Sequence, residues 1–174
     1  TLALMLEAQA LGHTIYYITP QDIWLEQNIV QAKMHSLTVA DHDQNWFDFK
    51  SNTQQSLSTL DCIFLRKDPP FNMEYIYLTY MLELVEQQGV LVINKPRSVR
   101  DANEKLFTGW FPQCCPPTCV SSQASVLLSF LQRHPHCILK PLDSMGGNGI
   151  SIVQLSDTDP QQHLEQATEQ GHKT

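Results

Sequence analysis

The apolar residues near the start of the chain follow a helical pattern first and a β-type pattern afterwards. Positions 2–9 carry apolar residues at helical spacing and Gly12 follows them, which predicts a helix that ends at a glycine. Residues 14–19 are β-branched and aromatic, which predicts a strand that Pro20 ends. A helix followed by a strand indicates the second half of a β-α-β unit whose opening strand is missing.

Further along, residues 29–39 alternate apolar and polar side chains, and residues 46–49 continue the pattern. Such alternation is typical of a strand with one face exposed. We expect a strand or a ribbon in this region.

Two short apolar runs, at 60–65 and 90–93, each stop at a polar segment that contains proline. The helical pattern of residues 73–85, closed by Gly89, separates them. Buried strands that alternate with helices predict a parallel, doubly wound sheet, in which ligands bind at the carboxyl ends of the strands. The polar segment at 66–70 therefore lies where a site is expected.

The pattern changes near residue 100, where we place a boundary between a domain of residues 1–100 and a domain of residues 101–174. In the second part, two strands flank a glycine-rich loop, and three stretches have helical patterns. The predicted helices are 101–111, 122–131 and 160–169, and the predicted strands are 137–139 and 150–153.

Composition and charge exclude some functions. The formal charge of -7 and only 11 Lys and Arg residues argue against a nucleic-acid partner. No apolar run reaches the roughly 18 residues of a membrane-spanning helix, and no leader pattern is present, so we expect a cytoplasmic protein without a membrane partner. Cys114, Cys115 and Cys119 form a cluster that lacks the paired spacing of a zinc site, so reduced thiols are expected.

The strongest chemical signal is the segment Lys140–Gly149, which has three glycines in its last four positions. Glycines let the backbone bend over a ligand and turn its N–H groups toward phosphate oxygens, and Lys140 adds a positive charge. The order of residues is not that of a P-loop. An ordinary glycine-rich hairpin turn remains the alternative.

This segment resembles the phosphate-binding hairpin of the ATP-grasp family, and in particular that of the prokaryotic glutathione synthetase family. Three further stretches resemble the same family in the same order: residues 66–71, 92–96 and 100–107. Together the four stretches identify the chain as a member. Ser144, where the family usually has glycine, and the additional Gly149 depart from its pattern.

The resemblance implies an α/β fold in two parts. A partial doubly wound parallel-sheet (pre-ATP-grasp) domain on the substrate side is followed by the first, α+β lobe of an ATP-grasp domain, and both parts are incomplete. The implied reaction is ATP-dependent ligation of γ-glutamylcysteine and glycine through an acyl phosphate. Charge neutralisation is the physical need, because a carboxylate must approach an anionic triphosphate.

By the same resemblance, Lys105 and Lys140 hold the ATP phosphates, although Lys105 taken alone would be a solvated surface lysine. The loop residues expected to cover ATP are Met145, Gly146, Gly147, Asn148 and Gly149. The Mg²⁺ ligands of the family are expected outside this segment, so no metal ligand and no catalytic residue is assigned. The segment alone is expected to be inactive, and the complete protein to be a homo-oligomer.

Arg66 and Asp68 follow a predicted strand and are our candidates for binding the dipeptide. Arginine can pair with a carboxylate through two hydrogen bonds, and aspartate can pair with an ammonium group. The alternative is an internal Arg66–Asp68 pair that rigidifies the turn. Two other functions stay open: another ATP-grasp carboxylate-amine ligase, such as a D-alanine:D-alanine ligase, and a non-catalytic nucleotide-binding fragment.

Overall fold

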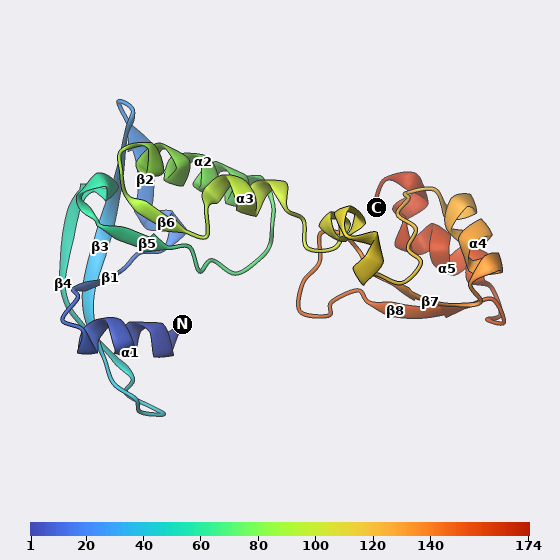
Figure 1. Ribbon diagram of the computed structural model, residues 1–174, viewed down its shortest axis with the longest axis horizontal. Helices are drawn as coiled ribbons and strands as arrows, with labels where there is room; N and C mark the ends of the chain where they lie inside the picture. The colour runs from blue at the N-terminus through green and yellow to red at the C-terminus, as the bar shows by residue number, and fades with distance from the viewer. The chain divides into compact units, whose positions relative to one another are not determined.

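The computed structural model describes residues 1–174, which divide into two compact units (Figure 1). The first unit comprises Thr1–Asp68 and Met73–Arg100, and the second comprises Pro69–Asn72 and Asp101–Thr174. Each unit contains helices and strands, so the mixed α/β class expected from the sequence is confirmed. None of the helices combines the length and apolar character needed to cross a membrane.

The first unit is built on a four-stranded antiparallel sheet and a separate parallel pair of strands. The long strand β3 pairs with β1 and β2 on one side and with β4 on the other. Strands β5 and β6 form the parallel pair. The elements are α1 (Leu2–Ala10), β1 (Ile15–Tyr17), β2 (Ile23–Glu26), β3 (Ile29–Val39), β4 (Phe47–Ser56), β5 (Cys62–Phe64), α2 (Met73–Gln87), β6 (Leu91–Ile93) and α3 (Pro96–Asp101).

Helix α2 lies over one face of β3 and forms the core of this unit with it. Burial alternates along the first half of β3, so that Val30, Ala32 and Met34 are turned toward the helix; the alternation shifts by one residue at the irregularity between Ser36 and Leu37. Apolar residues of α2 and β6 meet them in one cluster. The buried members are Val30, Ala32, Met34, Leu57, Leu78, Leu82, Val85, Val90 and Val92.

Several predictions for this unit are confirmed and two are corrected. The helix closed by Gly12, the strand before Pro20 and the helix closed by Gly89 are present. Residues 46–49 do not continue β3; they belong to the separate strand β4, because the chain reverses after Val39. The prediction that residues 60–65 form a buried strand is wrong in part, because β5 has no partner but β6 and Phe64 is 52% exposed.

Pairing within the sheets is mostly antiparallel. Only β5 and β6 run parallel, so the doubly wound description of this unit stays a prediction. Strand β4 pairs with β3 alone, and a β-bulge interrupts this pairing at Lys50, which stands between the paired residues Phe49 and Ser51. The Lys50 side chain is 52% exposed and forms an ion pair with Asp48.

The carboxylate of Asp22 caps the short helical turn Pro20–Asp22 that follows β1. The carboxylate of Asp22 accepts hydrogen bonds from the Thr19 backbone N–H at 3.0 Å and from the Thr19 hydroxyl at 2.6 Å. The hydroxyl contributes most to holding the pKa of Asp22 below its ordinary value, while partial burial opposes the shift. A carboxyl whose pKa is lower in the folded state stabilises the fold above its unfolded pKa, and this stabilisation is lost as the pH falls through the folded pKa.

Replacing Asp22 by alanine is expected to lower the free energy of unfolding at pH 7 by about 1 kcal/mol, the usual effect of losing a cap. The difference from the wild-type chain should narrow as the pH falls from the unfolded pKa of about 3.9 through the lower pKa of the folded carboxyl. Urea unfolding at several pH values measures this. Asp41→Ala, at an exposed site, is the control. A difference that stays constant with pH would contradict the prediction.

The second unit contains a β-hairpin, two α-helices and short helical turns. Strands β7 and β8 pair antiparallel, from His136 opposite Gln154 to Leu139 opposite Ser151, and helices α4 and α5 pack together. The elements are η3 (Leu106–Trp110), η4 (Pro112–Cys114), α4 (Ala124–Arg133), β7 (His136–Leu139), β8 (Ser151–Gln154), α5 (Pro160–Ala167) and η5 (Glu169–Gly171).

The prediction of one helix over residues 101–111 is wrong. Helix α3 ends at Asp101, and a separate 3₁₀ helix begins at Leu106. The side-chain oxygen of Asn103 accepts hydrogen bonds from the N–H groups of Lys105 and Leu106, at 3.0 and 2.9 Å. Such a bond from an asparagine side chain replaces a helical backbone bond and starts a new turn. The predicted strands around the glycine loop and the other two helices are confirmed.

Candidate functional site

The loop between β7 and β8 depends on its glycines. Gly146, Gly147 and Gly149 have φ angles of 67°, 82° and 71°, a backbone conformation that other residues adopt at a cost. A Cβ atom on Gly149 would also lie 2.9 Å from the Pro141 ring, whereas open space surrounds Gly146 and Gly147. The three glycines are therefore needed for this loop conformation, and Gly149 is also needed for its packing on Pro141.

The loop presents unpaired donors. The N–H groups of Met145, Gly146 and Gly147 donate no hydrogen bond within the chain, whereas the next donor, the N–H of Asn148, bonds the Met145 carbonyl at 3.3 Å. Consecutive N–H groups in such a turn form a concave site for anions. The loop can therefore bind phosphate oxygens through its backbone.

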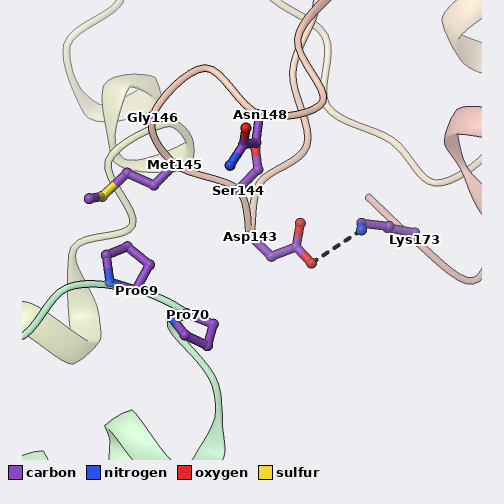
Figure 2. Close-up of a pocket in the computed structure, with 8 residues that line it drawn as sticks. All are labelled: Pro69, Pro70, Asp143, Ser144, Met145, Gly146, Asn148 and Lys173. Carbon is purple, nitrogen blue, oxygen red and sulfur yellow. Dashed lines mark ion pairs between the residues drawn. The ribbon is translucent and has the colours of Figure 1, made fainter.

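A cavity of about 510 Å³ lies beside the loop, and Figure 2 shows the side chains around it. All of its lining residues belong to the second unit. Its volume is within the range of small-molecule sites. The lining residues are Pro69, Pro70, Asp143, Ser144, Met145, Gly146, Asn148 and Lys173.

Lys105 lies against the loop. Its ammonium group donates a hydrogen bond to the carbonyl of Ser144 and pairs with Glu104 at 3.1 Å. Asn103, which starts the turn before Lys105, also donates through its side-chain amide to the carbonyl of Leu142 at 3.1 Å. Asn103 therefore fixes the segment of Lys105 to the first part of the loop.

Lys140 follows β7 as the first residue of the loop. Its side chain is exposed and makes no hydrogen bond or ion pair. The structure thus attaches Lys105 to the loop and leaves the exposed Lys140 side chain without a partner at the start of the loop. That both amines bind one triphosphate stays a prediction.

Arg66 and Asp68 belong to the first unit, after β5, and both are exposed. Arg66 donates to the Thr1 hydroxyl at 3.4 Å and forms no ion pair with Asp68, so the internal pair considered from the sequence is absent. Burial is the main cause that raises the pKa of Tyr75, and the charge of Asp68 adds to it. The Tyr75 hydroxyl donates to the carbonyl of Lys67, the residue before Asp68, at 3.4 Å, and a role of Asp68 in dipeptide binding stays a prediction.

Sequence reasoning missed three residues around the loop: Asn103, Asp143 and Lys173. Asn103 and Asp143 lie within the stretches that resemble the family. Each is a polar residue two positions before a predicted site residue, Lys105 or Met145, and this proximity is the signal that could have identified them. Nothing in the sequence marks Lys173. It reaches the cavity only through the turn that follows α5.

The cysteines, all free thiols, and the acidic residues form no metal site in these 174 residues. No three or more His, Cys, Asp or Glu side chains are grouped so that they could hold a metal ion. Burial, and then the neighbouring Cys119, raise the pKa of the Cys137 thiol.

Comparison with known proteins gives consistent matches over the whole chain. Residues 1–100 match the family model of the prokaryotic glutathione synthetase N-terminal domain, and residues 104–174 match that of the prokaryotic glutathione synthetase ATP-grasp domain.

Curated relatives match at 42–48% identity. The glutathione synthetase of Coxiella burnetii is 44% identical over 173 residues, which are 99% of this chain and 54% of that protein. That of Vibrio cholerae is 48% identical over 160 residues, 92% of this chain and 50% of that protein. That of Pseudomonas syringae is 45% identical over 171 residues, 98% of this chain and 54% of that protein. The chain thus spans about half the length of these relatives.

Proposed function

The chain belongs to the prokaryotic glutathione synthetase family, and we propose that it serves the ATP-dependent ligation of γ-glutamylcysteine and glycine to glutathione. In this reaction ATP phosphorylates the cysteinyl carboxylate of the dipeptide. The amine of glycine then attacks the acyl phosphate, and phosphate leaves. ADP and glutathione are the other products.

The observation that carries this proposal is the glycine loop with Lys105 bound to it. Three consecutive unpaired N–H groups and a lysine ammonium lie at one loop, beside a cavity large enough for a nucleotide's phosphates. This combination stabilises the negative charge that accumulates during phosphoryl transfer. The carbonyl of Ser144 holds the ammonium of Lys105 until a phosphate oxygen replaces it.

We assign the two units different parts of this reaction. The second unit, as the first lobe of an ATP-grasp domain, binds ATP through Lys105, Lys140 and the loop of Met145–Gly149. The first unit, as a doubly wound substrate-side domain, binds the dipeptide through Arg66 and Asp68. Both are exposed side chains at the end of a strand that runs parallel to its neighbour, where ligands of such sheets gather.

Magnesium is the cofactor that the family implies, and these residues do not fit it. No group of acidic or histidine side chains is placed to bind a metal ion. None of these residues is therefore a Mg²⁺ ligand in our proposal, and we propose that these residues alone do not complete the ligation. From the family resemblance we also expect a cytoplasmic homo-oligomer.

Replacing Lys105 by alanine is expected to weaken ATP binding about tenfold or more, because a charge-assisted hydrogen bond to phosphate is lost. Lys140→Ala should have an effect of the same size. Isothermal titration of the chain with ATP measures both. Lys33→Ala, an exposed lysine of β3 in the first unit, is the matched control and should leave ATP affinity unchanged.

Unchanged ATP affinity in both lysine variants would contradict the proposed nucleotide site.

A chimeric enzyme tests which substrates are ligated. In it, the chain replaces the matching residues of the Coxiella burnetii relative, and the product is identified by mass spectrometry. Glutathione formed from γ-glutamylcysteine and glycine supports the proposal. Product formed only from other carboxylate and amine pairs, such as two D-alanines, would favour another ligase of the same fold.

A further inference from the structure

A third lysine lies in the wall of the cavity beside the glycine loop. Figure 2 shows the Lys173 side chain directed at Asp143, and the ammonium-to-carboxylate distance is 3.3 Å. Both residues line the cavity together with the loop residues Ser144, Met145 and Gly146. The wall of the cavity therefore contains a lysine ammonium in addition to Lys105 and Lys140, the two lysines of the proposed nucleotide site.

The backbone after α5 determines the position of Lys173. Thr168 is buried, and its carbonyl accepts the N–H of Lys173 at 2.9 Å. Between them, the turn of η5 has positive φ angles of 48°, 55° and 98° at Glu169, Gln170 and Gly171. This turn reverses the chain, so that the carbonyl of Thr174 accepts the N–H of Leu142 at 3.3 Å, next to the loop. Lys173 is thus held beside the loop by its own backbone.

The ion pair of Lys173 is easily exchanged. The Asp143 side chain is 61% exposed, and the second partner, Glu169 at 3.8 Å, is 62% exposed. Solvent screens such pairs, which contribute little to stability. A phosphate group has more negative charge than a carboxylate and three acceptor oxygens, so it competes well for the same ammonium.

Asp143 also has an electrostatic consequence of its own. Its side chain lines the same cavity as Met145 and Gly146, whose N–H groups are unpaired, and alone its carboxylate would repel an incoming phosphate. Paired with Lys173, its charge is neutralised. Asp143 therefore opposes phosphate, and Lys173 both cancels that effect and supplies an attraction.

We propose that Lys173 is a third cation of the nucleotide site. Its ammonium group exchanges the carboxylate of Asp143 for a phosphate oxygen of a nucleoside triphosphate. The inference rests on the proposed function, because it takes the glycine-loop cavity as the phosphate site. It differs from a structural role, in which the Asp143–Lys173 pair only holds the loop in place.

The two roles predict opposite results for the two partners. If Lys173 binds phosphate, Lys173→Gln weakens ATP affinity about fivefold to tenfold, as for a lost charge-assisted contact. Asp143→Asn then strengthens ATP affinity or leaves it unchanged, since it removes the competitor. If the pair only holds the loop, both variants weaken ATP affinity alike.

The experiment is isothermal titration of the chain and of its variants with ATP and with adenosine. Adenosine affinity should not change in Lys173→Gln, because adenosine lacks phosphate, and Lys173→Arg should retain ATP affinity. Thermal unfolding of each variant confirms that it folds. Lys33→Gln, in the first unit, is the matched control.

The outcomes for the wild-type chain and for the variants separate the proposed nucleotide site from the role of Lys173. If the wild-type chain binds no ATP, the proposed nucleotide site fails, and the third cation fails with it. If the wild-type chain binds ATP and Lys173→Gln binds it equally well, only the third cation is overturned. Equal losses in Lys173→Gln and Asp143→Asn, or an equal loss of adenosine affinity, also overturn it.

Discussion

Replacing Leu82 by alanine is expected to lower the free energy of unfolding of the first unit by about 3 kcal/mol, within the usual range for a buried leucine. Leu82 lies on α2 with 2% of its surface exposed. It belongs to the same cluster as Met34 and Val30 of β3, both fully buried. The loss combines the transfer of the deleted methyl groups to water with a cavity that β3, held by strands on both sides, cannot close.

Chemical denaturation followed by circular dichroism measures this effect. Leu91→Ala is the matched control, because Leu91 on β6 is 58% exposed and the same atoms are deleted. Its effect should stay below about 1 kcal/mol, since little apolar surface returns to water. Equal losses in the two variants would show that α2 does not pack on β3 as described.

Replacing Gly149 by alanine is expected to destabilise the second unit by about 2–3 kcal/mol, from two separate causes. A φ angle of 71° costs an alanine about 1–2 kcal/mol. In addition, the new Cβ would lie 2.9 Å from the Pro141 ring, and that ring, fixed to the backbone, has little freedom to move. The hairpin must therefore shift at the start of the loop, next to Lys140.

Two other glycines separate these causes. Gly147→Ala has the positive φ angle but no atom within 4 Å of its Cβ, so about 1–2 kcal/mol is expected. Gly109→Ala has neither and should change stability by less than about 0.5 kcal/mol. Thermal unfolding of the three variants measures the series. The order Gly149, Gly147, Gly109 is the prediction, and equal effects at Gly149 and Gly147 would rule out the contact with Pro141.

Local pattern predicted much of the fold because the helices and strands concerned bury one regular face. The helical spacing of α2 and the alternation of β3 both arise from the core that these two elements share. Likewise, three glycines before a β-branched run predicted the hairpin of β7 and β8 and its loop.

The helices and strands that were predicted wrongly depend on side-chain hydrogen bonds and on strand pairing, and the spacing of apolar residues contains no information on either. One asparagine, Asn103, divides a helical pattern into two elements by bonding two N–H groups. Strand β4 is exposed along most of its length, and after Phe49 it has no apolar alternation to detect. The exposure of Phe64 follows from the lack of further strands beside β5, and a single strand's sequence cannot show that.

The candidate site was predicted in part for the same reason. The glycine loop is a continuous stretch, so its residues stand together in the sequence. Lys173 is separated from Asp143 by β8, α5 and the η5 turn, and only the left-handed backbone of that turn brings it back. Resemblance to the family supplied Lys105, which no pattern of its own distinguished.

The bulge at Lys50 has a consequence for the behaviour of the chain in solution. The outer edge of β4 carries ten residues of backbone with no neighbouring strand, together with the exposed rings of Phe47 and Phe49. A flat edge of this length is a template onto which a strand of another molecule can add. The extra residue distorts the regular spacing of donors and acceptors, and its charged side chain would have to lose water in any such assembly. The extra lysine in β4 therefore opposes the pairing of this strand edge with a strand of another molecule, which is a first step of aggregation.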